Sequence, residues 1–241
     1  ASLATFKSIN HTLGISNLLN NLGAVYYSQG DNPKGLEYYF ESLRFAERIN
    51  DKERIATAYM NIGAVYAEDN DTWVQARENY AKSLEISREI DAKDAIGTTA
   101  INIADLFIQE KKSKEAIPYL DMALEAFEEI GGNLSTVMNL FGDSKIVEKD
   151  YLGAIDFYNK GLRDGEDSES DLDIALSYIG LGQANNGLKN YSQAISSLKK
   201  AEAITLKTKL NNERRDTYEE LAKVYASAGQ YESAFVYQSK F

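Results

Sequence analysis

Residues 20–31 read NNLGAVYYSQGD, and residues 60–71 read MNIGAVYAEDND. The two stretches share the run GAVY, and their glycines, Gly23 and Gly63, lie forty residues apart. Self-similarity at a fixed period of 20–50 residues is typical of proteins built from stacked structural repeats. The two stretches therefore predict further copies at the same spacing along the rest of the chain.

The anchor recurs six times, each time as a small residue after a large apolar one. The six anchors are Gly23, Gly63, Ala104, Gly142, Gly182 and Ala222. A second small residue follows twelve or thirteen positions later, at Gly35, Ala76, Ala116, Ala154, Ala194 and Ala234, and a long side chain comes four residues after that, at Tyr39, Tyr80, Leu120, Tyr158, Leu198 and Gln238. A small residue opposite a large one lets two helices approach closely, so each copy predicts a tightly packed helix pair.

The spacing within each copy is helical. In the stretch ATAYMNIGAVYAE (56–68) the apolar residues recur every three or four positions, which predicts one apolar stripe on a helix. Polar segments such as EDND (68–71) then predict a turn between a first helix, helix A, and a second, helix B. The predicted repeats are 15–50, 53–90, 94–130, 134–164, 171–208 and 212–241.

This pattern resembles the tetratricopeptide repeat (TPR). The matching features are the Leu-Gly and Ile-Gly pairs, the tyrosines Tyr26, Tyr66 and Tyr225 three residues after the anchor, and the alanine of helix B. The forty-residue period is similar to that of kinesin light chains and of bacterial peptide-sensing regulators. The resemblance implies an all-α fold, a right-handed superhelical solenoid of six helix-turn-helix repeats with partial helices at both ends.

The resemblance spans residues 1–241 as a single TPR solenoid, with Lys145 and Asn185 departing from the pattern at the tyrosine position. SLATFKSINH (2–11) aligns with SLRFAERIND (42–51), which is the last part of a helix B. We therefore expect residues 1–10 to be the remnant of such a helix, and the segment to come from a longer chain.

Composition excludes several classes of function. The net charge of −11 argues against nucleic acid and against direct binding of anionic membranes, since both need a basic surface. Cysteine is absent and His11 is the one histidine, so a catalytic triad and a thiolate or histidine metal site lack their residues. The acidic stretch 68–80 lacks the glycine of a calcium loop and has Tyr80 where its glutamate should stand. We expect no enzyme activity, no catalytic residues, no metal and no cofactor.

The resemblance implies that a partner lies along a concave groove lined by the A helices. The groove positions are −6, −3, −2, +1, +4 and +5 relative to the anchor. They give the candidate peptide-binding residues Asn17, Asn20, Asn21, Tyr27, Thr57, Asn61, Glu68, Thr98, Asn102, Asp105, Gln109, Asn139, Asp143 and Gln183. Asn21, Asn61 and Asn102 share the slot at −2. A row of amides there holds an extended peptide by its backbone, or else each amide bonds a neighbouring helix.

Positive charge is nearly missing from these slots, with Lys223 as the exception. The sequence therefore predicts a neutral or basic protein or peptide partner rather than an acidic-tailed one. Similarity to Bacteroidetes-type bacterial signalling proteins implies the regulatory or sensor arm of a histidine kinase, a nucleotide cyclase or a transcriptional regulator. A free-standing cytoplasmic adaptor is the alternative. In the first case, the segment is expected to lie on the periplasmic face of a membrane-anchored parent protein.

Overall fold

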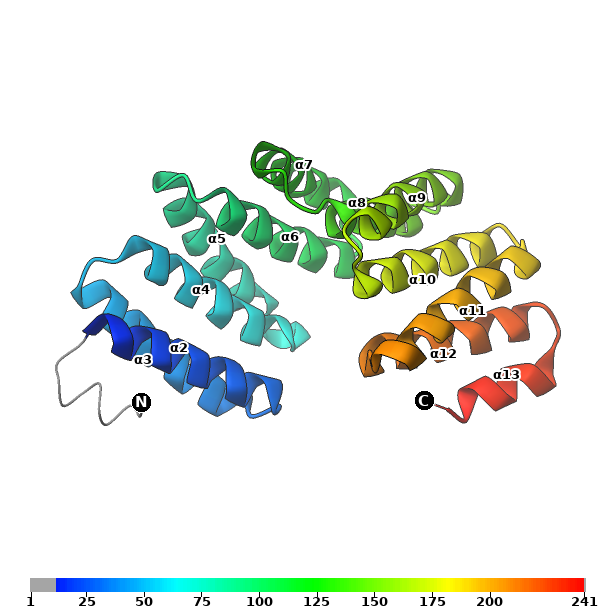
Figure 1. Ribbon diagram of the computed structural model, residues 1–241, viewed down its shortest axis with the longest axis horizontal. Coiled ribbons are helices and arrows are strands. Elements are labelled where there is room, and N and C mark those ends of the chain that lie inside the picture. The colour runs from blue at the N-terminus through cyan, green and yellow to red at the C-terminus, as the bar shows by residue number, and fades with distance from the viewer. Residues whose placement is uncertain (1–11, 241) are drawn as a thin grey trace. The chain divides into compact units, whose positions relative to one another are not determined.

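The computed structural model describes residues 12–240, which are built from α-helices joined by short turns (Figure 1). Twelve α-helices and one 3-10 turn, and no strand, occur among these residues. In chain order they are α2 (Thr12–Ser28), α3 (Asn32–Arg48), α4 (Lys52–Ala67), η1 (Asn70–Thr72), α5 (Trp73–Glu89), α6 (Lys93–Gln109), α7 (Ser113–Ile130), α8 (Ser135–Val147), α9 (Tyr151–Asp167), α10 (Asp171–Gly187), α11 (Tyr191–Thr208), α12 (Asn211–Ser227) and α13 (Tyr231–Gln238). The predicted all-α class is confirmed. The remnant helix expected at 1–10 lies outside the described residues.

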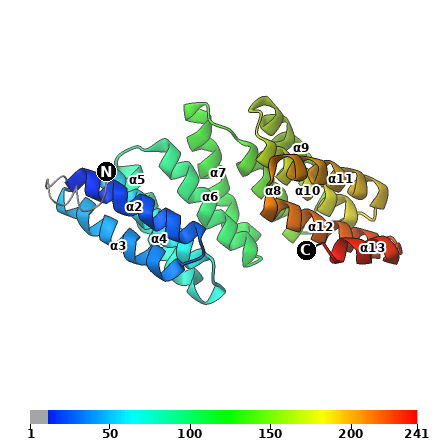
Figure 2. The same ribbon diagram turned by 60° about the horizontal axis from the view of Figure 1, so that its bottom comes forward.

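The chain forms two compact units, Ala1–Leu106 and Phe107–Phe241. In the first unit α2 packs against α3, α3 against α4, and α4 against α5 (Figure 1). In the second unit each helix from α7 to α13 packs against the next, and Figure 2 shows α10 beside α11. Even-numbered helices are the A helices and odd-numbered helices the B helices. The boundary falls within α6, so the extent of a single array stays a prediction.

The predicted close approach of helix A and helix B occurs at the anchor glycines. A Cβ atom placed on Gly63 would lie 2.6 Å from Cδ1 of Tyr80, so the tyrosine ring occupies the space that a side chain would need. The same contact joins Gly23 to Tyr39, Gly142 to Tyr158 and Gly182 to Leu198, with distances of 2.7, 2.5 and 2.5 Å from the added Cβ to the nearest atom. All four large side chains are almost completely buried. This contact is the repeated unit of the core.

A shared turn ends most of the helices. One residue adopts the left-handed conformation, and the next N–H bonds the carbonyl five residues before it, as in the Schellman motif. At the end of α10, Lys189 has φ 62° and Asn190 N–H donates to Asn185 O at 2.8 Å. Positive φ occurs at the non-glycine residues Asn50, Asp91, Lys111, Lys149, Glu169, Lys189 and Lys209, and at Gly30, Gly131 and Gly229. The turns thus fix where the helices end, although a non-glycine residue at positive φ is sterically strained.

The second repeat departs from this turn because it carries one extra residue. Its helix A, α4, continues into the 3-10 turn η1 before α5 begins. Trp73 closes the segment, since its indole N–H donates to Ala67 O at 3.0 Å across the turn. Thr72 Oγ1 also donates to Tyr66 O at 2.6 Å. Through these bonds Trp73 and Thr72 tie the start of α5 back to the end of α4.

The glycine contacts generate a first prediction. Gly63→Ala is expected to lower the free energy of unfolding by about 1–3 kcal/mol, because the new methyl group overlaps the buried Tyr80 ring. Gly35→Ala is the matched control, since its Cβ would find ordinary contacts at 3.4 Å or more. That change is expected to raise stability by about 0.5–1 kcal/mol, because Ala replaces Gly within a helix. Urea denaturation measures both, and equal effects would contradict the packing described.

The left-handed turns generate a second prediction. Lys189→Gly is expected to stabilise the protein by about 0.5–1 kcal/mol, because glycine adopts positive φ without the steric cost that lysine has there. Lys189→Ala, which keeps a Cβ, is the control and is expected to change stability little. Thermal unfolding of the two variants is the measurement. A glycine variant no more stable than the alanine variant would show that the turn is unstrained.

Candidate functional site

A polar pocket lies between the A helices of the first two repeats. Its volume is about 300 Å³, and it is lined by Ser16, Asn17, Asn20, Asn21, Ser42, Glu53, Arg54 and Thr57. Every lining residue carries a hydrogen-bonding side chain. Four of them, Asn17, Asn20, Asn21 and Thr57, are predicted groove residues. The pocket lies wholly within the first unit.

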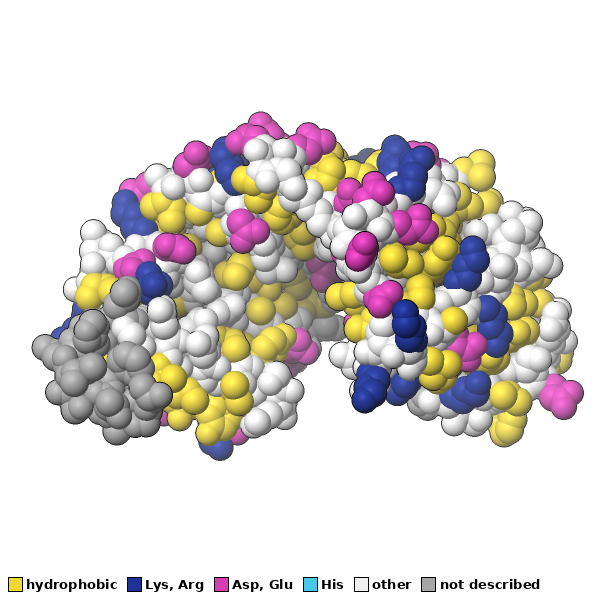
Figure 3. All heavy atoms as spheres, viewed as in Figure 1, with side chains coloured by type: hydrophobic (Ala, Val, Ile, Leu, Met, Phe, Trp, Pro, Cys, Tyr) yellow, Lys and Arg dark blue, Asp and Glu magenta, His cyan; other side chains and the backbone are white. Residues whose placement is uncertain are grey.

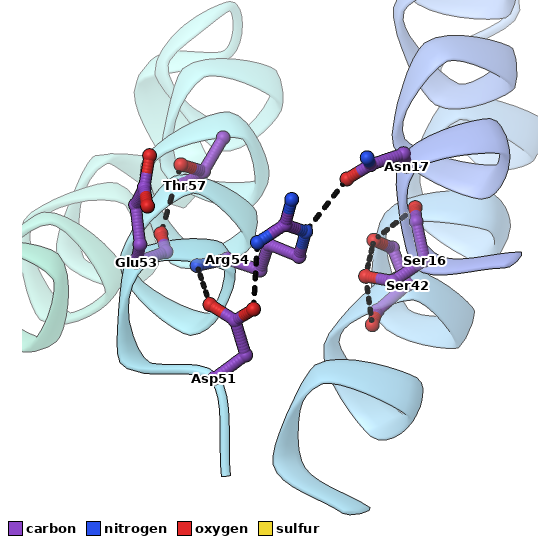
Figure 4. Close-up of polar contacts among 7 residues, drawn as sticks. All are labelled: Ser16, Asn17, Ser42, Asp51, Glu53, Arg54 and Thr57. Atoms are coloured by element: carbon purple, nitrogen blue, oxygen red, sulfur yellow. Dashed lines mark hydrogen bonds and ion pairs between the residues drawn. The ribbon is translucent and has the colours of Figure 1, made fainter. Parts of the chain in front are cut away.

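Arg54 bridges the pocket from α4 to α2 (Figure 4). Its Nε donates to Asn17 Oδ1 at 2.7 Å, while its Nη1 donates to Asp51 Oδ2 at 2.6 Å. Behind it, Ser16 and Ser42 bond each other between α2 and α3, with Ser42 Oγ donating to Ser16 O at 2.8 Å. The guanidinium is therefore held in one orientation, with an acid on one side and an amide on the other.

Two more polar contacts continue this line between α2 and α4. Asn61 Nδ2 donates to Asn20 Oδ1 at 2.8 Å, and the Tyr27 hydroxyl donates to the Glu68 carboxylate. The three contacts Asn17–Arg54, Asn20–Asn61 and Tyr27–Glu68 are called the polar rungs below. Arg54 and Asn61 on α4 and its C-cap residue Glu68 are seven positions apart, which places them on one stripe of the helix. Neighbouring A helices are thus joined through hydrogen bonds as well as through the core.

The sequence did not predict four of the pocket residues, Ser16, Ser42, Glu53 and Arg54, of which Arg54 carries the positive charge. It lies nine positions before its anchor, outside the slots used for the prediction, so the groove is less depleted in positive charge than expected. The spacing of seven from Arg54 to Asn61 to Glu68 is the signal that could have found it. Lys223, the expected exception, forms ion pairs with Glu219 at 2.7 Å and Glu220 at 2.8 Å.

The asparagines of the shared slot at −2 differ in their surroundings. Asn61 bonds the neighbouring helix through its rung with Asn20. Asn21 is exposed and Asn102 half-buried, and neither has a hydrogen-bond partner among the described residues. The structure therefore shows an inter-helix bond for one of the three, and a peptide-binding row of amides stays a prediction.

The other predicted site residues divide between the two units. Asn17, Asn20, Asn21, Tyr27, Thr57, Asn61, Glu68, Thr98, Asn102 and Asp105 belong to the first unit, and Gln109, Asn139, Asp143 and Gln183 to the second. Asn139 corrects the prediction, because it is only 6% exposed and its Oδ1 accepts a hydrogen bond from Ser177 Oγ at 2.8 Å. Gly161 beside it has no side chain, which lets the amide turn inward. Asn139 therefore joins α8 to α10 and does not offer its side chain to a ligand.

Three tyrosine hydroxyls on the A-helix side have perturbed acidity. Burial is the main cause that raises the pKa of Tyr80, and the charges of Asp105 and Glu68 add to it. Burial followed by the hydrogen bond to Glu68 raises the pKa of Tyr27. Burial and then Asp143, whose Oδ1 accepts the Tyr158 hydroxyl at 2.6 Å, raise the pKa of Tyr158. All three phenols stay protonated at neutral pH.

Charge is unevenly distributed over the face seen in Figure 3. The surface over α2 and α4 is largely uncharged, whereas Lys and Arg side chains are spread over α10–α12. Within residues 12–240, no group of three or more His, Asp or Glu side chains is placed to hold a metal ion. None of the helices in that range has the length and apolar character needed to cross a bilayer.

Comparison with known families gives one family for both units. Models of the tetratricopeptide repeat match residues 14–73, 55–129 and 175–207. A search of curated proteins found no matching sequence. The matched segments together cover more than half of the chain.

Several solved structures share the fold. BtubC (BKLC) from P. vanneervenii is 21% identical with a TM-score of 0.72, over 86% of this chain and 88% of that one. A STAND signal transduction ATPase with a tetratricopeptide repeat sensor, from Pyrococcus horikoshii, is 18% identical with a TM-score of 0.74. That match covers 94% of this chain but only 35% of the ATPase. A Rap protein complexed with Competence and Sporulation Factor is 13% identical with a TM-score of 0.72, over 93% of this chain and 73% of that one.

The buried tyrosines generate a third prediction. Because the pKa of Tyr80 is higher in the folded protein than the value of about 10 for an unfolded chain, its contribution to stability is present below pH 10 and is lost as pH rises further. Above pH 10, each such tyrosine lowers the free energy of unfolding by about 1.4 kcal/mol per pH unit. Between pH 10 and 11.5, Tyr80→Phe is expected to make the decline of the unfolding free energy with pH shallower by about this amount. Urea denaturation across this range tests it, and an unchanged slope would contradict it.

Proposed function

The chain belongs to the tetratricopeptide repeat family, and on that premise we propose that this protein-interaction repeat domain binds an extended, neutral or basic peptide segment without catalysis. The binding surface is the A-helix side of the first unit, from α2 to the part of α6 that carries Asn102 and Asp105. The observation that carries the proposal is the polar pocket between α2 and α4.

The pocket has the chemistry of a peptide-backbone site. Its volume of about 300 Å³ is at the lower end of the range for ligand pockets, but its walls are polar, whereas small-molecule pockets are mostly apolar. Peptide backbones present alternating N–H and C=O groups. Serine, threonine and asparagine side chains offer both donors and acceptors to such a chain. An extended segment therefore fits this pocket better than an apolar ligand does.

The polar rungs leave hydrogen-bonding capacity unused. In the Asn20–Asn61 rung, one amide N–H and one carbonyl oxygen are engaged, so the Asn61 oxygen and the Asn20 amino group remain available. Asn21 and Asn102 add two amides without partners among the described residues. The rung thus orients its amides while keeping a donor and an acceptor for a ligand. Such fixed orientation reduces the entropy lost on binding.

Charge on this surface favours a neutral or basic partner. Asp51 is ion-paired to Arg54, which offsets the positive charge in the pocket. Glu53, Glu68 and Asp105 are carboxylates on the same A helices. An acidic segment would be repelled by these three carboxylates, and a basic one would be attracted to them.

Structural neighbours support a signalling role for this binding. One is named as a signal transduction ATPase with a TPR sensor, and another is complexed with Competence and Sporulation Factor. We propose that the chain is the regulatory or sensor arm of a bacterial signal-transduction protein. Neighbouring A helices can pack in more than one arrangement, and a ligand that binds one arrangement better than another would increase its population. That shift would change the activity of the attached output domain.

The binding surface generates a fourth prediction. Asn61→Ala combined with Asn102→Ala is expected to weaken binding of the partner about tenfold, because two amide hydrogen bonds of roughly 0.5–1.5 kcal/mol each are lost. Partners are captured from extract of the source cells, identified, and titrated against each variant by calorimetry. Circular dichroism checks that the double variant folds.

The control for this prediction is Asn79→Ala on α5, whose amide bonds the carbonyl of Gln75 on its own helix. It is expected to bind the partner as the wild type does. Equal affinity of the double variant and the wild type would move the site off the A helices. The alternative of a free-standing adaptor would be favoured if the chain held two stable proteins together and no signalling activity responded to the binding.

A further inference from the structure

Helix α2 exposes an apolar stripe that the other A helices bury. The positions −5, −1 and +2 relative to the anchor lie on one side of a helix, because they are four and three residues apart. In α4, α6, α8, α10 and α12 every residue at these positions is buried, and those at +2 are at most 4% exposed. In α2 the same positions hold Leu18 and Leu22, which are half-buried, and Val25, which is 49% exposed. These three residues are called the α2 stripe below.

In the other repeats this side of helix A meets the preceding helix B. Thr99, at position −5 of α6, shares a hydrogen bond of 3.2 Å with Ser83 on α5. Ile62 and Val65, at −1 and +2 of α4, lie in one buried cluster with Tyr39 on α3. The α2 stripe is therefore a surface of the kind that a helix B covers elsewhere in the chain.

Helix α13 exposes the matching surface of a helix B. Its first and fifth residues, Tyr231 and Phe235, are 73% and 72% exposed, and they are called the α13 face below. The first residue of α9, Tyr151, has its ring against Gly187 at the end of α10. The fifth residue of α11, Ile195, packs against a buried cluster that includes residues of α12. In α9 and α11 this side of helix B is thus covered by the following helix A.

We propose that a second copy of this chain docks on the α13 face through its own α2 stripe, so that copies associate head to tail. The α13 face fits a helix with the pattern of helix A, and among the described A helices α2 is the one whose matching stripe is open. The contact joins two different surfaces, so it is heterologous and produces a ring or an open row of copies. It goes beyond the proposed function, because the α2 stripe contains none of the groove positions.

The two surfaces match in the size of their side chains. Ser28, at the end of α2, stands at the same repeat position as Gly187 at the end of α10. Its small side chain leaves room for the Tyr231 ring, as Gly187 does for the ring of Tyr151. Phe235 then lies along the leucines and the valine of the α2 stripe, which removes apolar surface of both copies from water.

The two surfaces also match in charge. The chain carries a net charge of −11, so two copies repel each other over much of their surfaces. Helix α2 contains no Asp, Glu, Lys or Arg, and Glu232 is the one charged residue of α13. A contact between these two helices therefore avoids most of the like-charge repulsion.

Sedimentation velocity of the full chain, from micromolar to submillimolar concentration, tests the proposal. The sedimentation coefficient of the wild type is expected to rise with concentration beyond that of a dimer. Val25→Glu places a charge in the α2 stripe, and Tyr231→Ser combined with Phe235→Ser removes both rings of the α13 face. Each variant is expected to weaken association about tenfold or more, because a buried charge or the loss of aromatic anchors is costly at an interface. Circular dichroism is expected to show unchanged folding, since all three side chains are exposed.

A mixture of the two variants distinguishes a head-to-tail contact from other kinds of association. Val25→Glu keeps an intact α13 face, and the double variant of α13 keeps an intact α2 stripe. The equimolar mixture is therefore expected to form one-to-one dimers and nothing larger, although each variant alone stays monomeric. Leu152→Glu is the matched control, because Leu152 is 70% exposed on the helix B α9 and belongs to neither surface. It is expected to associate as the wild type does.

Four results would each overturn the proposal. A wild type that stays monomeric over the whole concentration range would show that copies do not dock. Association of Val25→Glu alone at wild-type strength would show that two α13 faces pair with each other instead. A mixture of the two variants that stays monomeric would show that the surfaces do not recognise each other. Loss of association in Leu152→Glu would show that copies associate through other apolar surface.

Discussion

The contact between a glycine of helix A and a buried ring of helix B is the constraint on which the rest of the structure depends. It sets how closely the two helices of a repeat approach, because no side chain fits between Gly63 and Tyr80. Close packing of this kind gains dispersion contacts that a looser crossing would lose. The same contact also fixes where the tyrosine hydroxyl lies.

The A helices are joined to one another in a different way from the helices of one repeat. Helix A and helix B meet mainly through apolar and aromatic side chains, with single polar bonds such as Ser16–Ser42, whereas α2 and α4 share the three polar rungs. The rung residues therefore hold adjacent helices together and also face the surface proposed for binding. A ligand that bonds Asn61 or Glu68 would act on groups that join two repeats. This arrangement gives a physical route from binding to a change in repeat packing.

The candidate site was predictable in its location but not in its details. The anchor spacing selected Asn17, Asn20 and Asn21, and all three line the pocket between α2 and α4. It missed Arg54, because a slot nine residues before the anchor lies one turn beyond the stripe that was counted. It also placed Asn139 on the surface. Helical periodicity gives the side of a helix that a residue occupies, but not whether a neighbouring helix leaves room for its side chain.

The sequence by itself determined the repeat, its period, the helix pairs and the close contacts at the glycines. These follow from local spacing and residue size, which are written in the order of the chain. The tertiary structure decided which polar side chains bond each other, because partners such as Asn20 and Asn61 lie about forty residues apart and meet only after two repeats have stacked. It also decided that Asn139 turns inward, since Gly161 on the next helix leaves the space that Ser42 and Ser83 fill in other repeats. Accessibility is a property of neighbours in space, and the order of residues alone does not specify it.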